Sequence, residues 1–180
     1  TLMPIPQEAI DRLALSVQPL VFETGIEDFP YSTRGTVFLV GYEGKPYVLT
    51  ARHALNPEDP VPICVFPSDT SHRLIPLKDV FFVSRSDEGE DFVDLAAIAI
   101  DTMGITHPEV AQARLIDLAL ACGDWMSYAS GAQFFVLGYP EERSIVSYET
   151  QELRTDRMAL FGRYGGPSSL PHLHLLRVSD

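Results

Sequence analysis

Cysteine is scarce in this 180-residue sequence, and its scarcity excludes one class of protein. The two cysteines, Cys64 and Cys122, are too few for the disulfide framework that holds small secreted domains together. We therefore expect two buried thiols and a reducing, cytoplasmic compartment. The alternatives, a Cys64–Cys122 disulfide and a secreted or periplasmic location, stay open.

Basic residues are also in short supply. Lys and Arg number 13 against 25 Asp and Glu, which gives a formal net charge of −12. Nucleic acids and anionic membranes are bound through basic faces, so we expect neither as a partner. No apolar run is long enough to span a membrane, and no signal peptide is visible. Because the sequence begins at Thr1 without Met, a removed leader or preceding domain stays open.

Metal-ligand patterns are missing as well. The spacing of the two cysteines suits no zinc site, and the five histidines form no metal-binding pattern. His172 and His174 would share one face of a strand, but a third ligand is lacking. We therefore expect no metal and no other cofactor.

The most informative stretch that is present runs from residue 35 to residue 55. An apolar run that begins Gly35-Thr36-Val37-Phe38 breaks at a Glu-Gly-Lys-Pro turn, and a second apolar run ends in Thr50-Ala51-Arg52-His53. Two apolar runs joined by such a turn predict a β-hairpin. Its second strand places His53 at a strand end, where a histidine can be held rigidly enough to act as a general base. Taken alone, the stretch fits an ordinary strand-to-loop histidine better, because single motifs often match by chance.

Two further stretches follow in order. Asp94 directly precedes the apolar run Leu95–Ile100, and residues 134–140 read Phe-Phe-Val-Leu-Gly-Tyr-Pro. Over residues 17–180, the order and spacing of the three stretches resemble those of the trypsin-like (chymotrypsin-fold) serine peptidases. That family has Gly-Thr-x-Phe before Thr-Ala-x-His, then an Asp ahead of an apolar strand, then a Gly-Tyr/Phe-Pro strand.

The resemblance implies an all-β fold of two Greek-key β-barrels. Residues 1–103 would form the N-terminal barrel that carries His53 and Asp94, residues 104–123 the connection, and residues 124–180 a C-terminal barrel without its last strands. Six short strands separated by turns agree with a closed first barrel. A short amphipathic helix within residues 4–15 would pack on the outside of that barrel. Besides the hairpin we expect a polar loop at 24–34 and strands at 16–22, 61–66, 80–84, 95–100, 125–128, 133–138, 145–155, 158–163 and 172–178.

The nucleophile of the resemblance is missing, because the string Gly-x-Ser-Gly does not occur. Ser130-Gly131 comes nearest, yet it lacks the first glycine and precedes the Gly-Tyr-Pro strand, whereas the family's nucleophile follows that strand. Cys122-Gly123 is misplaced in the same way. We therefore expect the nucleophile, a serine rather than a cysteine, beyond residue 180, and expect these 180 residues alone to be inactive.

If the family's roles carry over, His53 takes the proton of the nucleophile and returns it to the leaving amine, while Asp94 holds the other imidazole nitrogen. Thr50 and Ala51 would shape the backbone around that contact. The expected function is a serine endopeptidase domain that acts on a polypeptide substrate, in a protein that can carry other domains.

Two alternatives stay open. The first is a catalytically dead member of the fold that acts as a protein-binding module. The second is an unrelated all-β domain with chance matches, in which His53 and Asp94 would lie far apart.

Overall fold

The computed structural model describes residues 5–55, 62–66, 74–82, 94–100, 114–121, 133–147, 149–150 and 152–163. This part of the chain is mostly β-structure with one short α-helix, α1 (Gln7–Ala14). Six strands form the body of the molecule: β1 (Val17–Ile26), β2 (Phe29–Tyr42), β3 (Lys45–Thr50), β4 (Ile63–Val65), β5 (Ile75–Phe82) and β6 (Ala96–Ile100).

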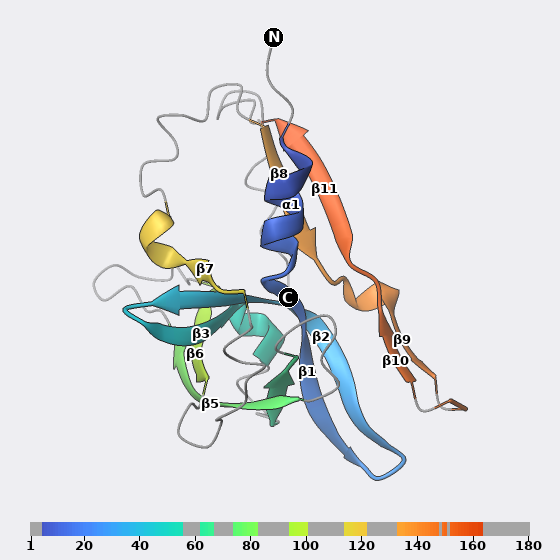
Figure 1. The fold of residues 1–180 in the computed structure, drawn as a ribbon. Coiled ribbons are helices and arrows are strands. Elements are labelled where there is room, and N and C mark those ends of the chain that lie inside the picture. Colours follow the sequence, from blue (N-terminus) through green and yellow to red (C-terminus); the bar gives the residue numbers. More distant parts are fainter. Residues whose placement is uncertain are drawn as a thin grey trace.

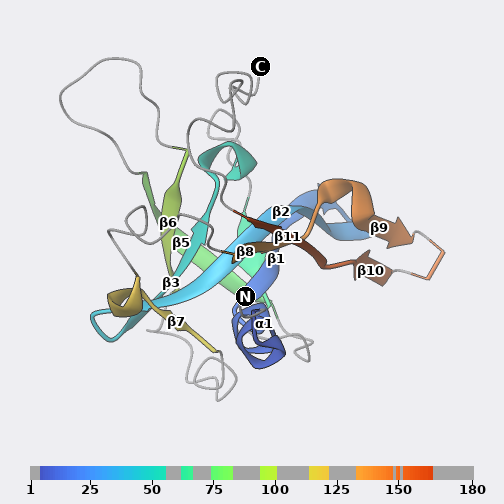
Figure 2. The same ribbon diagram turned by 90° about the horizontal axis from the view of Figure 1, so that it is seen from above.

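The six strands form a closed antiparallel barrel. Neighbours pair in the order β1-β4-β5-β6-β3-β2, and β1 also pairs with β2, which closes the ring. Figure 2 shows these strands from above. A short strand, β7 (Ile116–Asp117), pairs with β2 in parallel. The closed six-stranded barrel predicted from the sequence is confirmed.

Side chains alternate along the strands because successive residues point to opposite faces. In β6, Ala96, Ile98 and Ile100 are buried while Ala97 and Ala99 are less so. The inward-facing positions of the barrel strands meet in one apolar cluster, which contains Leu20, Val37, Leu39, Val48, Val65, Ile75, Leu77 and the three β6 residues. This core holds the strand ends that carry the candidate site.

The polar loop expected at 24–34 is wrong. Strand β1 continues to Ile26 and β2 begins at Phe29, so the two strands form a long hairpin with a short turn. The Thr24 hydroxyl donates to the carbonyl oxygen of Phe29 and accepts from the N–H of Ile26 at 3.1 Å. The polar residues therefore belong to an exposed, projecting hairpin and not to an irregular loop. Hydrogen bonds of the Thr24 hydroxyl stabilise its turn.

Two other strand boundaries differ from expectation. Strand β5 begins at Ile75, earlier than the strand expected at 80–84, and its pairing with β6 shifts register at Asp79, whose φ is 47°. Such a bulge breaks the alternation on which sequence patterns depend. The single strand expected at 145–155 is wrong, because the structure has two paired strands, β9 (Ser144–Ser147) and β10 (Glu152–Thr155).

Beyond the barrel, β8 (Gln133–Gly138) pairs with β11 (Met158–Arg163) along its whole length. Figure 1 shows α1 standing beside this pair, with the β9–β10 hairpin directed away from the barrel. Ile10 and Ala14 of α1 pack with Val17 of β1 and with Leu137 and Tyr139. The helix thus joins the start of the barrel to β8.

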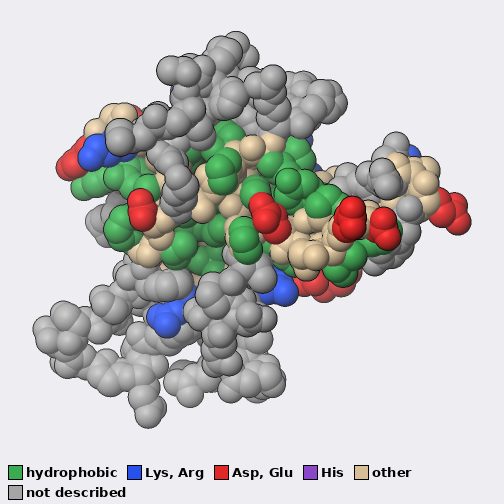
Figure 3. Space-filling model, turned by 90° about the horizontal axis from the view of Figure 1, so that it is seen from below, with side chains coloured by type: hydrophobic (Ala, Val, Ile, Leu, Met, Phe, Trp, Pro, Cys, Tyr) green, Lys and Arg blue, Asp and Glu red, His purple; other side chains and the backbone are tan. Residues whose placement is uncertain are grey.

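The strands expected at 125–128 and 172–178 lie outside the described residues, so a second barrel remains a prediction. The view from below in Figure 3 shows acidic side chains spread over a face whose centre is hydrophobic, which agrees with the net charge of −12. Among the described residues, no helix has the length and apolar content needed to cross a membrane.

Candidate functional site

His53 lies in a single 3-10 turn, η1 (Arg52–Leu55), that begins where strand β3 ends. The N–H of Ala54 donates to the carbonyl oxygen of Ala51 at 3.2 Å. Ala54 and Leu55 are both buried in the barrel core. Because the buried Ala54 and Leu55 hold the turn against the core, the His53 imidazole is directed outward.

Asp94 reaches the same place from the neighbouring strand of the sheet. It directly precedes β6, and β6 pairs with β3 so that Ala96 lies opposite Thr50. The residue shortly before Ala96 and the residue shortly after Thr50 are therefore brought together by the register of two neighbouring strands. The structure thus brings His53 and Asp94 into contact, although they are far apart in the sequence.

The contact uses both oxygens of the carboxylate. His53 Nδ1 and Asp94 Oδ2 are 2.5 Å apart, and the backbone N–H of His53 donates to Asp94 Oδ1 at 3.0 Å. Partial burial raises the pKa of Asp94, but hydrogen bonds from the backbone and ring of His53, its charge and the Arg52 backbone together hold that pKa below its ordinary value. The carboxylate is therefore ionised and fixed, as an orienting group must be.

The second ring nitrogen of His53, Nε2, is on the exposed side of the imidazole. The His53 side chain is 71% exposed and that of Asp94 is 38% exposed. With Nδ1 bound to the carboxylate, the tautomer that carries a proton on Nδ1 is favoured, which leaves Nε2 as a proton acceptor. Among the described residues, none hydrogen-bonds to Nε2. This arrangement can accept a proton from a hydroxyl group placed beside it.

A second set of hydrogen bonds lies behind the turn. The Thr50 hydroxyl donates to the carbonyl oxygen of Thr36 at 2.8 Å, and the N–H of Tyr139 donates to the Thr36 hydroxyl oxygen at 2.7 Å. Sequence reasoning gave Thr50 a role in shaping the backbone, but assigned none to Thr36. The sequence sign was its place in the Gly35-Thr36-Val37-Phe38 stretch that opens the hairpin.

The rejected nucleophile candidates Ser130 and Cys122 both lie outside the described residues. Cys64, the cysteine that is described, is a free thiol buried in the barrel. Burial first, and the nearby Glu23 carboxylate second, raise the pKa of this thiol, which makes it a poor nucleophile. Within the described ranges, no group of three or more His, Cys, Asp or Glu side chains is placed to hold a metal ion.

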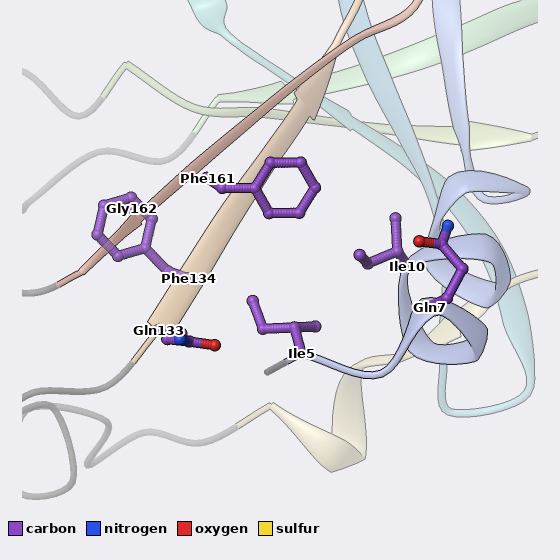
Figure 4. Close-up of a pocket in the computed structure, with 7 residues that line it drawn as sticks. All are labelled: Ile5, Gln7, Ile10, Gln133, Phe134, Phe161 and Gly162. Atoms are coloured by element: carbon purple, nitrogen blue, oxygen red, sulfur yellow. The ribbon is translucent and has the colours of Figure 1, made fainter. Parts of the chain in front are cut away.

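An apolar groove of about 430 Å³ lies between α1 and the β8–β11 pair. Figure 4 shows Ile5 and Ile10 on the helix side and Phe161 on the strand side, with the Phe134 ring lying over Gly162. A Cβ atom on Gly162 would come within 2.5 Å of that ring, so the glycine makes room for it. Neither His53 nor Asp94 lines this groove, so the candidate site is the His–Asp pair and not the hollow.

Comparison of the chain with models of protein families gave no match, and comparison with curated protein sequences gave none either. The functional argument therefore depends on the residues and their geometry.

Proposed function

We propose that the chain belongs to a trypsin-like serine endopeptidase, in which His53 is the general base and Asp94 orients it. The nucleophile would be a serine beyond residue 180, and the substrate a polypeptide. The observation that carries the proposal is the 2.5 Å contact between His53 Nδ1 and Asp94 Oδ2 beside an exposed Nε2. The interpretation as an unrelated domain with chance matches required these side chains to lie far apart.

In this mechanism His53 Nε2 takes the proton of the serine hydroxyl while the oxygen attacks the peptide carbonyl carbon. The imidazolium that forms is stabilised by the Asp94 carboxylate at Nδ1, and its new proton then passes to the leaving amine. Water repeats the cycle on the acyl-enzyme and restores the serine. The hydrogen bond from the His53 backbone N–H to Asp94 Oδ1 keeps the carboxylate in place through both halves.

The strand order of the barrel supports the same proposal at the level of the fold. Strands β4, β1, β2 and β3 are neighbours in that order. A Greek key has this spatial order, with the fourth strand returning to lie beside the first. The β8–β11 pair would then begin a second barrel, which the chain after residue 163 and beyond residue 180 would complete.

The proposal is tested by peptide hydrolysis with the natural gene product that contains this chain. His53→Ala should abolish hydrolysis, and Asp94→Asn should lower kcat by about 10⁴-fold because the wrong tautomer is then favoured. Asp28→Asn removes a carboxylate from the exposed turn between β1 and β2, so it serves as the charge-matched control and should retain full activity. Circular dichroism should show all variants folded.

The alternative function is a binding module without catalysis. In that case the wild-type gene product would hydrolyse no peptide, so Asp94→Asn would have no hydrolysis to lower. Unchanged hydrolysis in purified His53→Ala would contradict the peptidase assignment directly.

A further inference from the structure

Thr36 lies where three segments of the chain meet. Its own strand is β2. Its carbonyl oxygen accepts a hydrogen bond from the Thr50 hydroxyl of β3 at 2.8 Å, and its side-chain oxygen accepts one from the N–H of Tyr139, just after β8, at 2.7 Å. One residue therefore joins the barrel strand that leads to His53 to the segment that follows β8.

Thr50 carries this connection toward the candidate site. It is buried, and it lies opposite Val37 in β2 on one side and opposite Ala96 in β6 on the other. The chain continues from Thr50 into the turn with His53, and the residues just before Ala96 include Asp94. A shift of Thr50 would therefore displace both His53 and Asp94.

The junction is closely packed where Gly138 approaches Thr36. A Cβ atom on Gly138 would lie 3.0 Å from the Thr36 hydroxyl oxygen, so glycine allows the strand to approach this near. Gly35, with a φ of +79°, lies against the turn that holds His53, and a Cβ atom there would be 3.8 Å from the Ala54 Cβ. Tyr139 is buried as well. Displacement of the chain at Gly138 would therefore press on Thr36.

We propose that Thr36 is a positioning residue that sets where the segment after β8 lies relative to the His53–Asp94 pair. Its hydroxyl oxygen holds the segment and its carbonyl oxygen holds the strand that leads to His53. The catalytic meaning of this link rests on the proposed function, in which groups on the β8 side complete the site around His53. Misplacement of reacting groups by about 1 Å can lower a rate by about 100-fold.

The test is an NMR comparison of variants of this chain, because its readouts need neither a nucleophile nor hydrolysis. Thr36→Val keeps the shape of the side chain but removes the hydroxyl. The Tyr139 N–H should then exchange with solvent about fivefold faster, as expected for the loss of one hydrogen bond. The ring 13C–H and 15N signals of His53 should shift in the same variant. Thr36→Ser, which restores the hydroxyl, should return both readouts to their wild-type values.

Two further variants make the result decisive. Thr24→Val removes a hydroxyl at the far turn of the same hairpin and should change neither readout. Gly138→Ala pushes on the Thr36 hydroxyl from the other side, so it should shift the His53 signals even if Thr36→Val does not fold. Faster Tyr139 exchange with unchanged His53 signals would reduce Thr36 to a structural contact and overturn the inference, as would unchanged exchange.

This inference and the proposed function fail separately. If the Tyr139 and His53 readouts change together but the gene product hydrolyses no peptide, the peptidase assignment is wrong and the role of Thr36 stands. If the gene product is an active peptidase but the two readouts do not change together, only the inference about Thr36 is wrong.

Discussion

Among single residues, Asp94 has the most defined role, because each of its carboxylate oxygens is bound by a different part of His53. The ring binds Oδ2 and the backbone N–H binds Oδ1. The sequence could indicate both residues, since His53 follows an apolar strand and Asp94 precedes one, each within a short local motif. It could not indicate the second hydrogen bond, or the one from Tyr139 to Thr36, because these depend on how distant strands pack.

The lowered pKa of Asp94 predicts how stability depends on pH. Since the folded chain holds this carboxyl ionised, the unfolded chain binds a proton first as pH falls below about 3.9. The stabilisation from Asp94 is thus complete above that pH and is lost below it, toward its lower folded pKa. Urea unfolding of wild type and Asp94→Asn should give a difference in free energy that shrinks as the pH falls below about 4. Asp28→Asn, the control, removes an exposed carboxylate and should unfold with about the wild-type free energy. An Asp94→Asn difference that is independent of pH would refute this explanation.

Gly138 permits the close approach of the segment after β8 to Thr36. Gly138→Ala should lower the free energy of unfolding by about 1 kcal/mol, because the new Cβ must displace the Thr36 hydroxyl or the strand. Gly41→Ala is the matched control: it is also a strand position, and its Cβ would meet only Leu115, at an ordinary 3.7 Å. Chemical denaturation of both should show a loss for Gly138→Ala alone. Equal stability of the two variants would mean that the approach is not constrained.

Among the elements, the β8–β11 pair has two unlike faces. Leu137 and Tyr139 pack against α1, whereas Phe134, Val136 and Leu160 are exposed. The sequence predicted both strands and the helix, because apolar residues recur there at the periods of strand and helix. It failed at residues 24–34 and 145–155. At the first, polar residues occupy a projecting hairpin; at the second, a turn at Glu149 and Thr150 divides one expected strand into two.

Neighbouring positions of β8 test whether α1 is held by this packing. Leu137 is 8% exposed and Val136 is 54% exposed. Leu137→Ala should cost about 2–5 kcal/mol of stability and speed amide exchange in α1, because a buried side chain is lost from the helix contact. Val136→Ala should cost less than about 0.5 kcal/mol and leave α1 unchanged. Hydrogen-exchange mass spectrometry of the two variants makes the comparison, and equal protection of α1 would contradict it.

For the whole molecule, the closed barrel is what converts two local motifs into a site. His53 and Asp94 come together because β3 and β6 are neighbours in the ring, whose order is β1-β4-β5-β6-β3-β2. Six strands separated by turns predicted that closure, since a closed ring leaves no open edge. The hydrogen bonds that hold the rest of the chain in place join residues that no sequence pattern pairs. They include the bond from Tyr139 to Thr36 of the barrel and the bond from Arg157, just before β11, to the carbonyl oxygen of Ala14 in α1.

The central claim, that His53 and Asp94 activate a serine, is tested most directly by intact mass. The natural gene product that contains this chain would be weighed before and after treatment with a fluorophosphonate, which bonds covalently to an activated serine oxygen and releases fluoride. We predict a mass above 20.0 kDa and a single adduct that His53→Ala abolishes. The absence of an adduct on the wild-type protein, or an adduct that persists in His53→Ala, would contradict the claim.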